Sequence, residues 1–163
     1  GRVRSRTLGQ KQRPHPTRVA RRMEPLTAAE FAEGALLLMD TAPIVYFLEH
    51  HRKFGPVFKP LFEAHATGQL RFAVTTVTLS EVLTGPLQAG DEALAKRYRA
   101  ILESWQVVDL DADIAESAAR LRASLRLKLA DAVQAASALA INADALVTHD
   151  RDFARVHSLR VIP

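Results

Sequence analysis

The chain has 163 residues, of which 48% are hydrophobic and 25% are charged, a balance that is ordinary for a soluble globular protein. A chain of this length fits one domain, which can bury roughly two-thirds of its unfolded surface. It contains no cysteine, which excludes disulfides, thiolate metal sites and cysteine nucleophiles and suits a reducing cytoplasm. No apolar run approaches the ~20 residues that span a bilayer, so we expect a cytoplasmic protein without a membrane partner.

The net charge of +4 is unevenly distributed along the chain. Residues 1–22 hold eight of the 22 basic residues and no acid, which leaves 14 basic and 18 acidic residues in 23–163 and a net charge there of −4. The basic segment could attract nucleic acid through phosphate contacts, or it could be extra sequence upstream of a native start at Met23, and we favour the second alternative. We expect residues 1–34 to form a disordered basic extension.

Short apolar runs with strand-like composition recur along the rest of the chain. They lie at 35–39, 70–77, 106–110 and 145–148, with a short fifth candidate at 159–163. The run at 70–77 is rich in Val, Thr and Phe, which are common in strands. Short apolar runs bounded by turn signals predict buried strands.

Helical patterns lie between these runs. Thr78 and Glu81 have the spacing of a capping box, and Gly85-Pro86 is expected to end the helix that they begin. The helix that we expect to start at Asp91 carries four apolar residues on one face, namely Leu94, Tyr98, Ile101 and Leu102. Further helices are predicted to begin near Pro43, to lie within 56–68, to carry the stripe Ile114, Ala118, Leu121 and Leu125, and to span the Ala-rich segment 130–140.

The alternation of strands and helices predicts an α/β domain over residues 35–163, with about five mainly parallel strands and helices on both faces. In such sheets, binding sites form beyond the carboxyl ends of the strands. Four acids are expected at that edge or in the helix starts above it: Asp40, Glu81, Asp131 and Asp150. Carboxylates that converge repel one another unless a cation lies between them, and hard oxygen ligands suit Mg²⁺ or Mn²⁺.

Each acid also has a purely structural interpretation. Asp40 could cap the helix that follows it, and Glu81 could complete its capping box. Asp131 could complement a helix dipole, and Asp150 could belong to a polar turn. For Glu81 and Asp131 taken singly, the structural interpretation is favoured. It is weaker for the set, because helix caps need not gather at one edge of a sheet.

The segment ALVTHDRDF places His149 between the fourth strand and two acids, Asp150 and Asp152. The two acids could form a metal site, His149 could act as a base, or the cluster could be a solvated turn. Neighbouring side chains beyond a strand end often point in different directions, and no second histidine is placed to pair with His149. We therefore expect His149 to be a surface or supporting residue.

Other chemistries lack their motifs. The chain has no GxxxxGK[ST] phosphate loop, no GxGxxG dinucleotide turn and no GxSxG nucleophile elbow. Two residues after Asp40, where an aspartyl-phosphate phosphatase has a second Asp, the chain has Ala42. Metal chemistry supported by acids alone remains.

The motifs that carry the acids resemble, in order and spacing, those of PIN-domain ribonucleases, in particular the VapC toxins of bacterial type II toxin–antitoxin pairs. They are Asp40-Thr41 after an apolar strand, Ser80-Glu81 in TLSEVLTGP, Asp131-Ala132 at the start of an Ala-rich helix, and LVTHDRDF. The similarity covers about residues 35–163. The basic extension departs from the pattern, as does Ala130, which stands where proline is common.

The resemblance implies a PIN-like three-layer sandwich with a five-stranded parallel sheet, and cleavage of RNA that depends on Mg²⁺ or Mn²⁺. It also implies a homodimer and a cognate antitoxin whose peptide fills the active-site groove. The site residues that it implies are the catalytic and metal-binding acids Asp40, Glu81, Asp131 and Asp150, with Asp152 as an accessory acid and Thr41 as a ligand or a supporting hydroxyl.

The expected function is therefore that of an endoribonuclease toxin, in which a carboxylate-bound metal ion activates water to hydrolyse RNA phosphodiester bonds. Because the expected folded part is net acidic, RNA would also need local basic residues, for which Lys128, Arg151 and Arg155 are candidates. The alternative function is a catalytically inactive PIN-like module that binds RNA or a protein. The presence of all four acids favours the enzyme.

Overall fold

A computed structural model of the chain describes residues 27–156 and 160–162, so residues 1–26 of the predicted extension (1–34) lie outside the described residues. Five strands form one sheet in the order β3-β2-β1-β4-β5, and every neighbouring pair is parallel. The strands are β1 (Ala35–Met39), β2 (Leu70–Thr75), β3 (Gln106–Val108), β4 (Ala145–Val147) and β5 (Val161–Ile162). The predicted α/β fold with a parallel sheet is confirmed.

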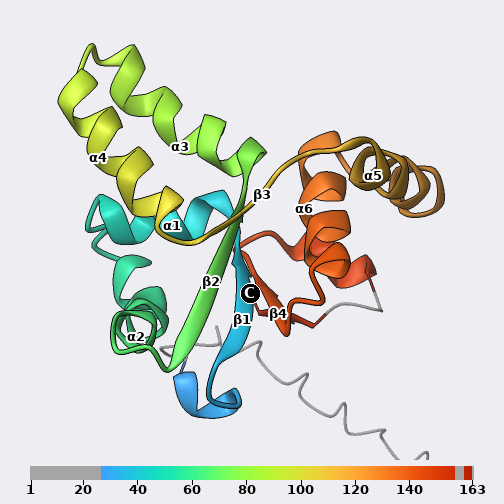
Figure 1. Cartoon of the computed structure of the whole chain (residues 1–163), viewed down its shortest axis with the longest axis horizontal. Helices are drawn as coiled ribbons and strands as arrows, with labels where there is room; N and C mark the ends of the chain where they lie inside the picture. The colour runs from blue at the N-terminus through green and yellow to red at the C-terminus, as the bar shows by residue number, and fades with distance from the viewer. Residues whose placement is uncertain (1–26, 157–159, 163) are drawn as a thin grey trace, which may run out of the picture.

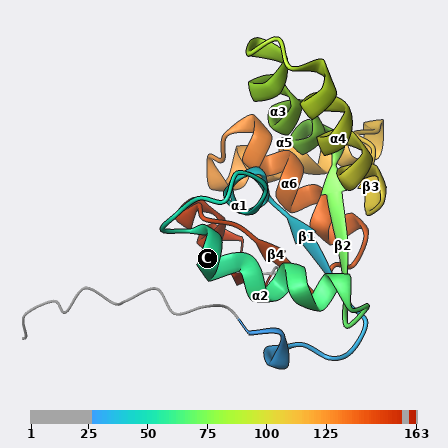
Figure 2. The same ribbon diagram turned by 90° about the vertical axis from the view of Figure 1, so that its left-hand side faces the viewer.

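Helices cover both faces of this sheet (Figures 1 and 2). The helices α5 and α6 pack on one face and α1 and α2 on the other, where α3 and α4 form a hairpin beside them. Their bounds are α1 (Thr41–Leu48), α2 (Gly55–Ala66), α3 (Thr76–Gln88), α4 (Glu92–Glu103), α5 (Ala112–Leu125) and α6 (Leu129–Ala140), with short 3₁₀ helices η1 (Ala28–Glu30) and η2 (Arg151–Arg155). Among the described residues, none of these helices is long and apolar enough to cross a membrane.

The central strand β1 divides the hydrophobic core into two clusters. All five of its residues are buried, as expected for a parallel strand covered on both faces. Leu37 and Met39 pack with Phe58 and other residues of the α1–α4 side, whereas Leu36 and Leu38 pack with the α5–α6 side. The alternation of side chains along one strand therefore fixes both helical layers on the sheet.

The start of α3 differs from the prediction. β2 ends at Thr75, whose hydroxyl accepts the N–H of Thr78 over 3.1 Å and caps the helix, so the predicted capping box of Thr78 and Glu81 is wrong. Thr75 pairs with Val108 of β3, which holds it in extended conformation. The strand-to-helix transition therefore occurs three residues earlier than predicted, and Glu81 is free for another role.

The predicted stop at Gly85-Pro86 is also wrong, because α3 continues to Gln88. Proline in the last turn of a helix removes only one backbone hydrogen bond, and the buried Pro86 ring packs in the interior. In α4, Asp91 caps the first turn as predicted, accepting the N–H of Leu94 over 2.9 Å. Its apolar face is narrower than predicted, since Ile101 is 37% exposed.

Residues just before β1 take part in the fold. Phe31 belongs to the core cluster on the α1–α4 side, so the prediction that the extension reaches residue 34 is wrong at this position. The guanidinium of Arg160 lies 4.7 Å from the centre of the Phe31 ring. The N–H of Gly34 donates to the carbonyl of Gln69 over 2.7 Å. The packed part of the described chain thus begins before Ala35.

The strand order creates a crevice at one place on the sheet edge. From β1 the chain builds β2 and β3 on one side and then returns to place β4 and β5 on the other. In parallel sheets such a reversal of strand order leaves a crevice beyond the carboxyl ends of the two strands that meet there. Asp40 directly follows β1, and Asp150 follows β4, so the sheet topology brings both acids to this crevice.

Candidate active site

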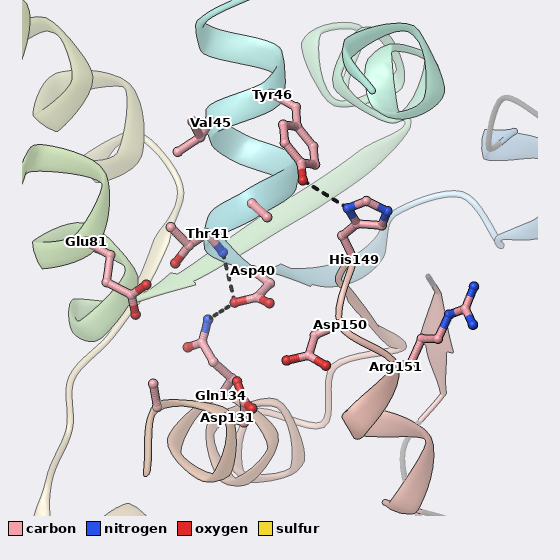
Figure 3. A pocket seen from close by; sticks show the side chains of 12 residues that line it. Asp40, Thr41, Val45, Tyr46, Glu81, Asp131, Gln134, His149, Asp150 and Arg151 are labelled. Carbon is pink, nitrogen blue, oxygen red and sulfur yellow. Dashed lines mark hydrogen bonds between the residues drawn. The ribbon is translucent and has the colours of Figure 1, made fainter. Parts of the chain in front are cut away.

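The four predicted acids line one open pocket of about 740 Å³ at the reversal point (Figure 3). Asp40 and Thr41 come from the β1–α1 junction, Glu81 from α3, Asp131 from α6 and Asp150 from the turn after β4. The remaining lining residues are Ala42, Val45, Tyr46, Ala130, Gln134, His149 and Arg151. The structure thus brings carboxylates from four separate segments of the chain together at this edge of the sheet.

The tightest group of carboxylates is Asp131, Asp150 and Asp152. One oxygen of each lies within 4.8 Å of the corresponding oxygens of the other two. Asp152, predicted as an accessory acid, is therefore a member of this group together with two of the four predicted acids. Asp40 and Glu81 project toward this group from other walls of the pocket (Figure 3).

The environment of Asp131 fits a bound cation. Burial, as the largest cause, and the charges of Asp150, Asp40 and Asp152 together raise the pKa of Asp131 to about 6, against the smaller opposing effect of Lys128. Its Oδ2 atom is buried and has no hydrogen-bond partner. Buried polar atoms are almost always paired, so an orphaned carboxylate oxygen among two other carboxylates suits a divalent ion with hard oxygen ligands.

Hydrogen bonds fix the orientation of the Asp40 carboxylate. Its Oδ1 accepts the backbone N–H of Thr41 and an amide N–H of Gln134, both over 2.9 Å, and its Oδ2 accepts the hydroxyl of Thr148 over 2.7 Å. Two donors occupy Oδ1, whereas Oδ2 keeps a lone pair for another ligand. Asp40 is thus both the predicted helix cap and a pocket residue.

Gln134 joins three parts of the site. Its side chain is 2% exposed, and its Nε2 donates to Thr78 Oγ1 over 2.7 Å as well as to Asp40. Its Oε1 accepts the hydroxyl of Thr75 over 2.5 Å. Gln134 lies one turn after Asp131, so α6 carries both an acid of the cluster and the amide that orients the acid after β1.

Glu81 and Thr41 meet at the rim of the pocket. The hydroxyl of Thr41 donates to Thr78 Oγ1 over 3.2 Å. Partial burial raises the pKa of Glu81, the charge of Asp40 raises it further, and a hydrogen bond with Thr41 lowers it. Glu81 otherwise lies at an exposed position, where its carboxylate can reach solvent and a ligand in the pocket.

Thr148 connects the first and last predicted acids. Its buried hydroxyl donates to Asp40 and accepts the N–H of Asp150 over 3.0 Å. Asp150 in turn caps η2, its Oδ1 accepting the N–H of Asp152 over 2.9 Å. The turn predicted as the structural alternative for Asp150 therefore exists, and it also positions the two acids of the cluster.

The family model of the PIN domain matches residues 37–159, which include every acid of the pocket. The chain belongs to the PIN-domain family. The sequence-based resemblance to this family is confirmed, and with it the α/β fold that it implied.

Solved structures similar to this PIN domain include proteins of toxin–antitoxin pairs. A toxin–antitoxin complex from Klebsiella pneumoniae contains a chain that is 26% identical, with a TM-score of 0.61 over 78% of this chain and 96% of that one. VapBC2 from Rickettsia felis, bound to a DNA fragment from its promoter, is 21% identical with a TM-score of 0.62, over 78% of this chain and 97% of that one. VapC20 from Mycobacterium tuberculosis, a toxin that cleaves the sarcin–ricin loop, is 17% identical with a TM-score of 0.60, over 78% of this chain and 99% of that one. It shares the fold. A search of curated proteins found no match.

One wall of the PIN-domain pocket is aromatic. Tyr46 and His149 both line the pocket, and the Tyr46 hydroxyl lies 2.9 Å from His149 Nδ1. The His149 ring is 4.5 Å from the ring of Phe54, measured between centroids. His149, expected to be a surface or supporting residue, is thus a half-buried part of the pocket wall.

Sequence reasoning identified the acids of this PIN domain but missed the neutral residues that hold them. The signals were present: Gln134 is a polar residue inside an Ala-rich helix, three positions after Asp131, and Thr75 and Thr148 each stand at the carboxyl end of a strand. Arg155, considered for RNA binding, instead lies 3.6 Å from Asp152 and donates to the carbonyl of Leu125 over 3.3 Å.

Proposed function

We propose that this PIN domain is an endoribonuclease that depends on Mg²⁺ or Mn²⁺ and acts in the cytoplasm as the toxin of a toxin–antitoxin pair. The observation that supports the proposal most directly is the cluster of Asp131, Asp150 and Asp152 around a buried carboxylate oxygen without a partner. Membership of the PIN-domain family and the similarity to VapC-type toxins support the same reaction class.

The acids of the pocket would hold the metal ion. Asp131, Asp150 and Asp152 offer one oxygen each within a small volume, and Asp40 offers the free lone pair of Oδ2. A divalent ion bound there supplies positive charge that binds the scissile phosphate and lowers the pKa of a water molecule. Gln134 and Thr148 hold Asp40 in one orientation, so the acid does not reorganise when the substrate arrives.

Glu81 is suited to the proton transfer. It lies at the pocket rim outside the group of three acids, and its raised pKa makes its carboxylate a better proton acceptor than an ordinary glutamate. Its hydrogen bond with Thr41 ties it to the helix that Asp40 caps. We infer that Glu81 accepts the proton of the attacking water.

The proposed partners are RNA, a cognate antitoxin and a second copy of the chain. The relative at 26% identity is part of a toxin–antitoxin complex, which supports an antitoxin partner for this chain. An antitoxin that covers the pocket would also explain how a cell tolerates a nuclease of this kind. The homodimer follows from the family resemblance stated above, and size measurements of the purified protein test it.

The test compares the wild type with Asp40→Asn. Total RNA is incubated with each purified protein and Mn²⁺ or Mg²⁺, and the new 5′ ends are mapped by sequencing. We expect discrete cleavage sites with the wild type and none with Asp40→Asn, while Asp109→Asn, an exposed acid outside the pocket, cuts like the wild type. A wild type that binds RNA without cutting it under either metal would instead be a binding module.

A further inference from the structure

A basic and aromatic loop borders the pocket between α1 and α2. We propose that His51, Arg52 and Lys53 of this loop, together with the ring of His149, form a subsite for a nucleotide of single-stranded RNA beside the carboxylates. The inference rests on the proposed ribonuclease function, because it identifies how the substrate strand is held next to the reacting phosphate.

Contacts place the loop directly against the pocket wall. Phe54 at the end of the loop contacts the His149 ring, whose Nδ1 lies 2.9 Å from the Tyr46 hydroxyl. The His51 ring packs on the Phe54 ring, with centroids 5.1 Å apart and an angle of 24° between the planes. The centroids of the His51 and Tyr46 rings are 4.9 Å apart. The loop therefore packs directly behind Tyr46 and His149, two residues that line the pocket.

The loop is held in one conformation by its own hydrogen bonds. His51 Nδ1 accepts the backbone N–H groups of Lys53 and Phe54 over 3.2 and 3.1 Å, so the neutral ring carries its proton on Nε2. The preceding His50 has φ of 51°, in the left-handed region. A Cβ on Gly55 would approach the carbonyl oxygen of Tyr46 to 3.2 Å, so the chain returns to α1 at close range. An ordered loop loses little entropy when it binds a ligand.

The chemistry of the loop suits a nucleic acid strand. Arg52 and Lys53 are exposed, and no ion pair among the described residues includes either of them. The Lys53 ammonium lies 5.0 Å from the centre of the Phe54 ring, so charge and aromatic surface occur together. Proteins that bind single strands combine cations for the phosphates with rings on which bases stack.

Electrostatics explain why such a subsite is needed. The residues after the basic N-terminal segment carry a net charge of −4, and the pocket is lined by four acids but only one Lys or Arg, Arg151, so the net charge there disfavours RNA phosphates. Arg155 is occupied by Asp152 and a backbone carbonyl. Unpaired cations in the α1–α2 loop offset this repulsion beside the pocket. An acidic peptide would use the cations but not the rings, which favours RNA as the ligand.

Equilibrium binding tests the subsite without relying on cleavage. A fluorescein-labelled, unstructured ten-nucleotide RNA is titrated with protein in EDTA, and anisotropy is measured at several salt concentrations. The double variant Arg52→Gln/Lys53→Gln is compared with Lys96→Gln/Arg97→Gln, a matched pair of exposed cations on α4 that lies outside the pocket. We expect the loop variant to bind the RNA ~10-fold more weakly than the wild type does. The slope of log K against log salt concentration should become less steep by about 1.4, which is about 0.7 for each of two lost phosphate contacts.

A second variant tests the aromatic contribution. His149→Gln retains a polar side chain but removes the ring, so affinity should fall about fivefold or more with an unchanged salt slope. Unchanged thermal unfolding confirms that each variant is folded. The proposal is overturned if the loop variant matches the α4 control in both affinity and slope, or if hexaglutamate displaces the RNA as effectively as unlabelled RNA does.

The same proteins separate this inference from the proposed ribonuclease function. If the loop variant loses RNA affinity while the wild type fails to cut RNA with Mn²⁺ or Mg²⁺, the subsite stands and the nuclease proposal fails. If the wild type cuts RNA and the loop variant binds and cuts equally well, the nuclease proposal stands and the subsite fails.

Discussion

Gln134 donates an amide N–H to Asp40 Oδ1 over 2.9 Å. This bond links α6, the helix that carries Asp131, to the acid that follows β1. The same Nε2 donates to Thr78, and the carbonyl oxygen of the amide accepts from Thr75. These bonds fix the orientation of the amide, with its nitrogen toward Asp40 and Thr78 and its oxygen toward Thr75. The orientation of Asp40 in the pocket therefore depends on a buried residue that carries no charge.

Replacing Gln134 with leucine tests this dependence. The substitution leaves the buried hydroxyl of Thr75 without its acceptor and removes one of the two donors to Asp40 Oδ1, so we expect the free energy of unfolding to fall by about 1–3 kcal/mol. Mn²⁺ affinity, measured by calorimetry, should fall about 10- to 100-fold, because residues that orient metal ligands contribute that much. Gln88→Leu, at an exposed position of α3, is the matched control. Equal Mn²⁺ affinity in the two variants would show that Gln134 only stabilises the fold.

Thr148→Val tests the second support of Asp40. Valine has nearly the same shape, but it removes the donor to Asp40 Oδ2 and the acceptor for the N–H of Asp150. We expect a loss of about 1–3 kcal/mol in unfolding by urea and weaker Mn²⁺ binding. Thr84→Val, which removes an exposed hydroxyl bonded to the Ser80 carbonyl, should change neither quantity by more than about 0.5 kcal/mol. Similar losses in both variants would contradict this role.

The sequence predicted the acids because their positions follow from topology. Parallel strands end at one edge of a sheet, so Asp40 and Asp150 were placed together without knowledge of any contact. The start of α3 was missed because it depends on pairing between Thr75 and Val108, which are far apart in the chain. Gln134 was missed for the same reason: its partners lie directly after β1, at the end of β2 and in α3, and its local sequence suggests only a helix.

The raised pKa of Asp131 predicts how the stability of the metal-free protein depends on pH. The folded carboxyl has a pKa of about 6, above its ordinary value of 3.8. Between these values the folded state keeps a proton that the unfolded state releases, so stability falls as pH rises from about 4 to 6. Asp131→Asn should remove this loss and unfold ~2–4 °C higher than the wild type at pH 7 in EDTA. This corresponds to about 1 kcal/mol once solvent screening of the partly exposed carboxyl is allowed for.

At pH 3.5 the folded state and most of the unfolded molecules of the wild type hold the proton on Asp131, so the advantage of Asp131→Asn should largely disappear. Asp113→Asn, an exposed acid in the first turn of α5, serves as the control for loss of a negative charge. Thermal unfolding at pH 3.5, 5 and 7 checks the prediction. A constant difference between the wild type and Asp131→Asn at all three values would rule out titration of Asp131 as its cause.

Protons and metal ions should compete for the same carboxylate cluster. A divalent ion held by Asp131, Asp150 and Asp152 needs ionised ligands, whereas Asp131 holds a proton below about pH 6. We expect the thermal unfolding temperature of the wild type to rise with Mn²⁺ at pH 7.5, because an ion that binds only the folded state stabilises it by mass action. Below pH 6, calorimetry should show Mn²⁺ affinity falling up to tenfold per pH unit with release of one proton on binding, and Asp150→Asn should abolish the thermal shift. An Mn²⁺ affinity independent of pH between 5 and 7.5 would place the ion away from Asp131.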